Sequence, residues 1–413
     1  MSFTPRGPVA RTVLLAGFGL VAWAGPSPSV APAAAQTDRL VAIGDVHGAS
    51  GQFHALLQTL DLIDDEYRWS GGTATLVQTG DLTDRGAGVR PVLDLLMRLE
   101  REAEAAGGRV VVLLGNHETM NLTANLRDTS PPMLARFADE ESEERRERAY
   151  EAYRAHVASR AEVLGPLAAE AQPRDAWMSA HPPGFLEYLD AMGPDGPYGR
   201  WLREKPVVTR LRDSVFLHGG LHPDGPDDLD DINRGVREEL ARYDRYRAQL
   251  VERGVILPFS TFQEIAAAVQ RELQAWVVRI APAGPPAPEP PAPLSRTDQE
   301  HVDMLLDMQG VLSWSIYDTD GPVWFRGFAR WNAAEGENAI TALADRYDAD
   351  RFVVGHSPPE SRLITPRFDA RVVLIDTGML TSRYAGRPSA LEIVDDEMTA
   401  VYLDRRVPLA EAP

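Results

Sequence analysis

Short apolar, β-prone runs alternate with helical patterns in the N-terminal part of the chain. The runs lie at 40–43, 73–78 and 110–114, and apolar residues at helical spacing mark 52–60 and 89–106. This alternation predicts a largely parallel sheet whose loops emerge where the strands end. Side chains on such loops would be held by a rigid scaffold, so we expect the functional residues there.

The middle of the chain reads as two insertions. Residues 125–205 include a densely charged stretch at 140–160 with opposite charges at helical spacing, which is typical of a solvated helix face. We interpret this segment as a helical insertion that could wall one side of a site. Residues 225–300 are polar and helical at first and proline-rich over 281–293, where composition favours an exposed, extended loop.

Strand signals return after the first insertion and dominate the last third of the chain. The final two form a closing antiparallel pair around Asp395-Asp396-Glu397. The predicted strands lie at 207–210, 214–217, 351–354, 371–375, 390–394 and 398–403. Because candidate site residues occur on both sides of the insertions, we expect one catalytic domain over residues 36–413.

Residues 1–35 have the pattern of a secretory signal peptide. Arg6 and Arg11 precede an apolar run at 12–24, and the small residues Ala33-Ala34-Ala35 follow. The run is shorter than the roughly 20 residues of a membrane-spanning helix, although an uncleaved anchor is the alternative. We therefore expect a periplasmic or secreted mature chain with no integral membrane segment after cleavage.

The composition of the chain disfavours some classes of partner and excludes some kinds of chemistry. The 413 residues carry a formal net charge of -19, which repels nucleic-acid backbones and disfavours DNA or RNA as a partner. The chain has no cysteine, which excludes disulfides and thiol chemistry. An anionic substrate would need local positive charge from metal ions and arginines.

A glycine-flanked polar block follows each of the three N-terminal apolar runs, and two later Gly-flanked histidines follow apolar runs as well. The blocks are Gly44-Asp45-Val46-His47-Gly48, Gly80-Asp81-Leu82-Thr83-Asp84-Arg85-Gly86 and Gly115-Asn116-His117-Glu118. Carboxylate, amide and imidazole groups delivered together suit Mn, Fe or Zn. Two such ions sharing a carboxylate can activate water for attack on phosphorus. The candidate metal ligands are Asp45, His47, Asp81, Asn116, His218 and His356.

Three neighbours of these ligands suggest phosphoester cleavage. His117 could donate a proton to a leaving oxygen, and Asp84 could orient the imidazole and hold it protonated. The planar guanidinium of Arg85 presents N–H donors in an arrangement that matches phosphate oxygens. The remaining histidines are predicted to be structural: His54, His156, His181, His222 and His301.

The blocks resemble the signatures of the calcineurin-like metallophosphoesterases, and within them the phosphoprotein phosphatases. His218-Gly219-Gly220-Leu221 is similar to a fourth signature block of that group. The stretches 320–327 and 375–379 resemble the Shewanella-like protein phosphatases of bacteria and plants. The resemblance runs from about residue 40 to 403 and implies an α/β fold, a four-layer αββα sandwich with helical insertions.

Residue by residue, the resemblance implies a two-metal centre. Asp45, His47 and Asp81 would hold one ion, and Asp81, Asn116, His218 and His356 the other. His117 with Asp84 would be the proton donor. Arg85 and Arg326 would bind the phosphate, and Tyr384 would line the site near the leaving group. Thr83 and His222-Pro223 depart from the usual pattern without touching the implied ligands.

These residues favour a dinuclear-metal phosphomonoesterase that acts on phosphoproteins, phosphotyrosine included, by attack of a metal-bound hydroxide. A nucleotide or diadenosine-polyphosphate hydrolase is the alternative, because such enzymes share the first blocks. They more often have Asp where this chain has Glu118. A non-catalytic metal-holding module is a third hypothesis, which the intact ligand set disfavours. The implied partner is a phosphorylated substrate, and the implied cofactors are two divalent or trivalent metal ions.

Overall fold

Two mixed β-sheets form the centre of the protein. The computed structural model describes residues 39–280 and 294–409. The strand orders are β11-β10-β9-β1-β2-β3 and β4-β5-β6-β8-β7. The predicted signal peptide at 1–35 and the proline-rich piece at 281–293 lie outside the described residues.

The first sheet joins the N-terminal strands to the C-terminal ones. Strands β1, β2 and β3 are parallel, as predicted, whereas β9, β10 and β11 add antiparallel neighbours beside β1. The predicted closing pair is confirmed, since Val394 pairs with Glu397. The strands are β1 (Arg39–Ile43), β2 (Thr75–Gln78), β3 (Arg109–Val112), β9 (Ser389–Val394), β10 (Glu397–Tyr402) and β11 (Arg406–Pro408).

The second sheet comes from the middle and the last third of the chain. Its three central strands, β5, β6 and β8, are parallel, and β4 and β7 pair with them antiparallel at the edges. The expectation of a largely parallel sheet therefore holds only for one half of the first sheet, β1 to β3, and for the centre of the second. The strands are β4 (Val208–Leu211), β5 (Ser214–Leu217), β6 (Arg351–Val354), β7 (Thr365–Arg367) and β8 (Val372–Leu374).

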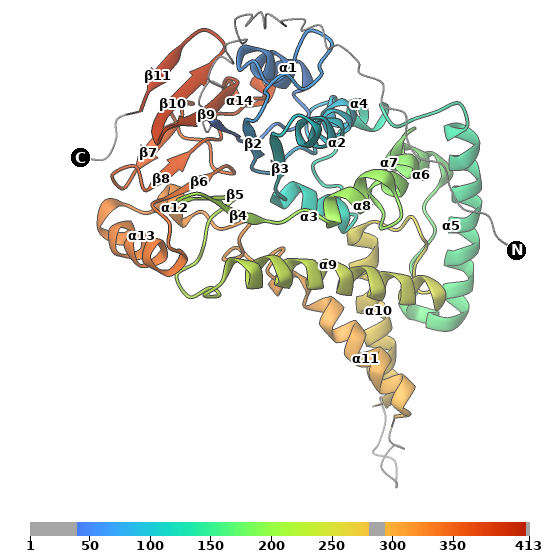
Figure 1. The fold of residues 1–413 in the computed structure, drawn as a ribbon. Helices are drawn as coiled ribbons and strands as arrows, with labels where there is room; N and C mark the ends of the chain where they lie inside the picture. The colour runs from blue at the N-terminus through green and yellow to red at the C-terminus, as the bar shows by residue number, and fades with distance from the viewer. Residues whose placement is uncertain (1–38, 281–293, 410–413) are drawn as a thin grey trace, which may run out of the picture. The chain divides into compact units, whose positions relative to one another are not determined.

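An apolar layer between the two sheets makes them a sandwich. Ala42 and Val77 of the first sheet belong to one buried cluster with Phe216, Val353 and Val373 of the second. Because side chains alternate along a strand, the opposite faces must be covered too. Figure 1 shows α1 and α2 beside the first sheet and α12 and α13 beside the second. The predicted four-layer αββα sandwich is confirmed.

The covering helices bury one apolar face each. Val92, Leu96 and Leu99 of α2 are fully buried, with the spacing of an amphipathic helix. Phe328 of α12 lies with its ring centroid 5.2 Å from that of Phe352 in β6. The covering helices are α1 (Ser50–Thr59), α2 (Val89–Ala105), α12 (Gly327–Arg330) and α13 (Ala333–Tyr347).

The predicted insertions contain most of the remaining helices. The expected charged helix at 140–160 is α5, and among the described residues no helix is long and apolar enough to cross a bilayer. The helices are α3 (Asn116–Leu122), α4 (Pro131–Leu134), α5 (Ser142–Leu164), η1 (Gly165–Leu167), α6 (Arg174–Ala180), α7 (Phe185–Met192), α8 (Pro197–Arg203), α9 (Leu229–Glu252), α10 (Phe262–Ile280), α11 (Arg296–Gln309), η2 (Val311–Ser313) and α14 (Thr381–Tyr384).

The last third of the chain contains helices as well as the strands expected there, which corrects the sequence interpretation. Helix α13 begins with a capping box, in which the Asn332 side chain accepts from the Glu335 backbone and the Glu335 carboxylate accepts from Asn332 N–H. Ile340, Leu343 and Tyr347 then bury one face. The capping pair and this spacing are the local causes of the helix.

Candidate active site

Turns that follow strands of both sheets meet at one edge of the sandwich. The backbone N–H of His356, after β6, donates to Oδ1 of Asp45, after β1, at 2.9 Å. Nε2 of His218, after β5, lies 2.9 Å from Oδ1 of Asn116, which follows β3. The structure thus brings the six predicted ligands together, although the two that share the first contact are 311 positions apart. All six are buried.

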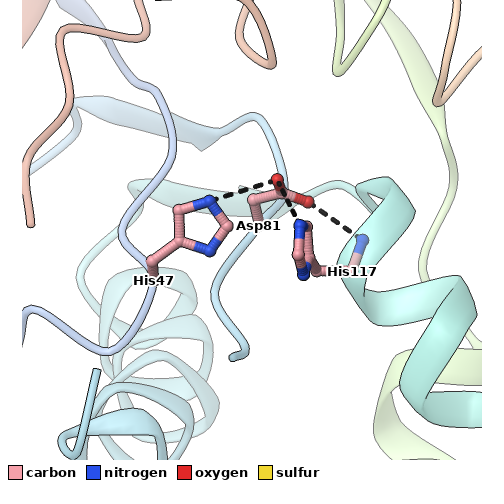
Figure 2. Close-up of side chains that lie close together, drawn as sticks. All are labelled: His47, Asp81 and His117. Atoms are coloured by element: carbon pink, nitrogen blue, oxygen red, sulfur yellow. Dashed lines mark hydrogen bonds and ion pairs between the residues drawn. The ribbon is translucent and has the colours of Figure 1, made fainter. Parts of the chain in front are cut away.

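The first cluster centres on one oxygen of Asp81. Oδ2 of Asp81 lies 3.4 Å from Nε2 of His47 and 3.9 Å from Nε2 of His117. Oδ1 of Asp81 accepts the backbone N–H of His117 at 3.1 Å, and Figure 2 shows all three contacts. Oδ2 of Asp45 is 3.8 Å from Nε2 of His47, which places a second carboxylate at this cluster.

The second cluster centres on Nε2 of His218. Oδ1 of Asp81 lies 3.2 Å from it, Oδ1 of Asn116 2.9 Å and Nδ1 of His356 3.0 Å. Asp81 therefore faces both clusters, one through each carboxylate oxygen.

Hydrogen bonds fix which ring nitrogens face the clusters. Nδ1 of His47 lies 3.0 Å from the carbonyl of Thr83, and Nδ1 of His218 lies 2.9 Å from the carbonyl of Thr79. Each Nδ1–H donates to its carbonyl, so in both rings the lone pair is on Nε2. In the second cluster that lone pair faces the Asp81 and Asn116 oxygens, which are acceptors too. A cation satisfies such convergent acceptors, so these residues fit bound metal ions.

Burial and neighbouring charges set the protonation of the clusters. Burial lowers the pKa of His47 to about 3 and that of His356 well below its ordinary value, which keeps both rings in the neutral form that binds metals. Burial, with Asp376 and Asp81 nearby, raises the pKa of Asp45 well above its usual range. Burial alone would raise the pKa of Asp81, but the surrounding histidines, His218 first, hold it well below.

His117 pairs with Asp84 beside the first cluster. Nδ1 of His117 donates to Oδ2 of Asp84 at 2.6 Å, and both side chains are buried. Burial alone would lower the pKa of His117, but the carboxylates of Asp81 and Asp84 outweigh it and raise that pKa. The higher pKa widens the pH range in which the ring is an imidazolium, the form in which Nε2 carries a proton to give.

Two arginines reach the site from different loops. Arg85 contacts Nε2 of His47 and the hydroxyl of Tyr384, and its buried Nε has no hydrogen-bond partner among the described residues. Arg326 donates to the carbonyl of His356 and to Oγ of Ser357, both at 2.9 Å. Both guanidinium groups thus lie next to candidate metal ligands.

Backbone geometry explains the glycines of the blocks. A Cβ on Gly115 would lie 2.3 Å from Oδ1 of Asp81, and one on Gly355 would lie 2.5 Å from Oδ1 of Asp45. Only glycine permits these close approaches. Left-handed backbone, which is costly for residues other than glycine and common at functional sites, occurs at His47, Asp81, Asp84, Arg85 and His356.

Sequence reasoning assigned no role to three acidic residues of the site. Glu118 is fully buried and accepts the backbone N–H groups of Asp81 and Thr83 at 2.7 and 3.0 Å. Asp376 is buried beside Asp45, and Oδ2 of Asp128 lies 3.9 Å from Nδ1 of His117. Glu118 and Asp376 lie in recognisable blocks, whereas no local pattern marks Asp128.

The histidines predicted to be structural stand apart from the clusters. Among the described residues, three sets of His and carboxylate side chains could hold a metal ion. They contain His47, His117, His218 and His356 but none of the histidines predicted to be structural. His181 shows the alternative environment, since its ring stacks on Trp177 with a centroid distance of 3.9 Å. Its Nδ1 lies 2.8 Å from the Trp177 carbonyl.

Comparisons with known proteins find relatives in sequence and in structure. The chain is 34% identical over 205 residues to Shewanella-like protein phosphatase 2 of Arabidopsis thaliana, a match over 48% of this chain and only about half (51%) of that relative. It is 23% identical over 371 residues to Shewanella-like protein phosphatase 1 of Plasmodium berghei, over 88% of this chain and 74% of that one. The cold-active protein-tyrosine phosphatase of a psychrophilic Shewanella has the same fold, with a TM-score of 0.54 and 21% identity over 91% of this chain and 81% of that chain.

The family profile described as calcineurin-like phosphoesterase matches residues 38–253, which is more than half of the chain. The matched region contains both carboxylates of the first cluster, together with Asn116 and His218. The family and the two His/Asp clusters together indicate a dinuclear metal site. The chain therefore belongs to the calcineurin-like phosphoesterase family.

Proposed function

We propose that this protein is a metal-dependent phosphomonoesterase that removes phosphate from proteins, phosphotyrosine included. The printed names of the relatives, two protein phosphatases and a protein-tyrosine phosphatase, support this substrate class. The observation that carries the proposal is the position of Asp81. Its two oxygens lie 3.4 Å from Nε2 of His47 and 3.2 Å from Nε2 of His218, as one carboxylate shared by two ions would require.

Two groups of side chains would hold the ions. When bound, a pair of ions supplies Lewis-acid activation of water and of the phosphoryl oxygens. Nitrogen and oxygen ligands of this kind suit Mn, Fe or Zn. The first group is Asp45, His47 and Asp81, and the second is Asp81, Asn116, His218 and His356.

The arginines would bind the phosphate. A guanidinium presents several N–H donors in one plane and pairs with phosphate oxygens through two bonds at once. Nε of Arg85 is a buried donor without a partner among the described residues, so a phosphate oxygen would satisfy it. Arg326, fixed by the carbonyl of His356, would contact the phosphate from the side of the second cluster.

His117 would protonate the leaving oxygen. Hydrolysis breaks the bond between phosphorus and the ester oxygen, and the departing oxygen needs a proton to leave as an alcohol or phenol. His117 keeps Nδ1 bonded to Asp84, so Nε2 is the atom that gives this proton. Water supplies the oxygen that joins phosphorus, and the products are the alcohol or phenol and inorganic phosphate.

Phosphate release from defined substrates tests the proposal. The purified chain with two equivalents of Mn²⁺ is assayed on a phosphotyrosine peptide, a phosphoserine peptide and a diadenosine polyphosphate. We expect turnover of the peptides, and none by Asp81→Asn. Asp303→Asn, on an exposed position of α11, is the matched control and should keep full activity. Turnover of the dinucleotide alone would contradict the protein-phosphatase assignment.

A further inference from the structure

A buried chain of hydrogen bonds links helix α7 to the proposed proton donor. The hydroxyl of Tyr188, in α7, donates to Oδ1 of Asn121 at 2.7 Å. Nδ2 of Asn121 donates to Oδ2 of Asp84 at 3.0 Å, and the same oxygen accepts from Nδ1 of His117 at 2.6 Å. All four side chains are at most 2% exposed.

Asn121 is the residue through which this series of hydrogen bonds holds Asp84 in place. Oδ1 of Asp84 has no hydrogen-bond partner among the described residues, so its carboxylate is oriented through Oδ2 alone. Apart from His117 itself, the side chain that bonds Oδ2 is Asn121. Asp84 can therefore hold the His117 ring at a fixed angle only while Asn121 holds Asp84.

Tyr188 bonds the oxygen end of the Asn121 amide, whose nitrogen end faces Asp84. Its hydroxyl occupies Oδ1, which leaves Nδ2 for Asp84 and for the carbonyl of His117 at 2.8 Å. A flipped amide would turn its oxygen toward the carboxylate and lose that bond. The Tyr188 ring packs edge-on against Phe137 with a centroid distance of 4.8 Å, which fixes the hydroxyl in place.

We propose that Tyr188 and Asn121 are positioning residues for the proton donor, so that a helix of the predicted insertion at 125–205 sets the angle of the His117 ring. This inference rests on the proposed function. It gives the insertion a role in the protonation of the leaving group. Both side chains are at most 1% exposed, so they would act through Asp84 and not by contact with the substrate.

The dependence of kcat on the leaving group distinguishes a positioning role of Tyr188 from a merely structural one. The variant Tyr188→Phe removes only the hydroxyl. The matched control is Tyr198→Phe, because Tyr198 comes from the neighbouring helix α8, also packs against Phe137, and donates to Asp94 at 2.7 Å. Phenyl phosphate needs a proton on its leaving oxygen far more than 4-nitrophenyl phosphate, whose phenolate is a weaker base.

We expect Tyr188→Phe to lower kcat for phenyl phosphate about tenfold, which is a fraction of the rate enhancement that a proton donor contributes. For 4-nitrophenyl phosphate, kcat should change less than about twofold. KM and metal content should not change, and Tyr198→Phe should resemble the wild type. In a His117→Asn background, Tyr188→Phe should cause no further loss. Equal losses on both esters, or a further loss without His117, would overturn the inference.

A second variant covers the case in which Tyr188→Phe folds poorly. Tyr188→Phe combined with Asn121→Leu removes both polar groups, so neither is left buried and unpaired. The same selective loss on phenyl phosphate is expected. In both variants the downfield NMR resonance of the proton between His117 and Asp84 should move, and an unmoved resonance would overturn the inference. A metal-loaded wild type that cleaves neither ester would instead refute the proposed function itself.

Discussion

Nδ1 of His117 lies 2.6 Å from Oδ2 of Asp84 and therefore cannot serve as a metal ligand. Nε2 of the same ring is 3.9 Å from Oδ2 of Asp81, close enough to suggest a ligand by distance alone. The raised pKa of His117 favours a proton on that nitrogen, and a protonated nitrogen does not bind a metal. We therefore predict that the ring acts beside the metal site as an acid and not as a ligand.

The substitution His117→Asn should separate these two roles. We expect the variant to retain two metal ions per chain and to lose a factor on the order of 10²–10⁴ in kcat with phenyl phosphate. Elemental analysis of the metal content and the measured kcat are compared between the variant and the wild type. Loss of an ion from the variant would mean that His117 is a ligand.

Removal of single ligands should distinguish the two clusters. His218→Ala removes the centre of the second cluster and should leave one ion per chain, because the contacts among Asp45, His47 and Asp81 remain. Asp81→Asn weakens both clusters and should reduce the content below one. Equal metal content in the two variants would argue against a shared carboxylate.

Glu118 should support the site through the backbone. Its carboxylate accepts the N–H groups of Asp81, Leu82, Thr83 and Gly115 at 2.7–3.0 Å. Glu118→Gln places an amide donor against these donors, so we expect the free energy of unfolding to fall by about 1–3 kcal/mol. Denaturant unfolding measures the change.

The matched control for Glu118 is Glu335→Gln, in the exposed capping box of α13. Glutamine also serves at that position of a capping box, so the free energy of unfolding should barely change. A similar loss in both variants would show that the position of Glu118 beside Asp81 confers no special stability.

His181 should make stability depend on pH. Burial lowers its pKa, so between pH 6.5 and that lower value the unfolded chain binds the proton that the folded chain excludes. Stability therefore rises with pH through this window, and below it the group has no further effect because both states bind the proton. In His181→Phe, which keeps an aromatic ring against Trp177, the melting temperature should fall less between pH 7 and pH 5. An unchanged pH dependence would contradict this prediction.

The candidate metal ligands could be predicted from the sequence because each follows a strand of clear apolar pattern. Asp45, Asp81 and Asn116 come just after β1, β2 and β3, whose ends lie at a common edge. Such local signals do not reveal pairing between distant segments. The contact between β1 and β9, for example, joins Arg39 to Val394.

Other features have no local signature. Strand β7 spans only Thr365–Arg367 and contains Pro366, so no apolar alternation marks it. Asp128 approaches His117 because of the path of the loop after α3, and Tyr188 reaches Asn121 because of how α7 packs. These positions depend on tertiary structure, which a single sequence does not display.

The most direct test of the two-metal account is phosphate release as Mn²⁺ is added stepwise to the metal-free chain. With a phosphotyrosine peptide as substrate, the account predicts negligible release without metal and a rate that reaches its maximum at two ions per chain. Full activity in the presence of a chelator, or a maximum at one ion per chain, would contradict it.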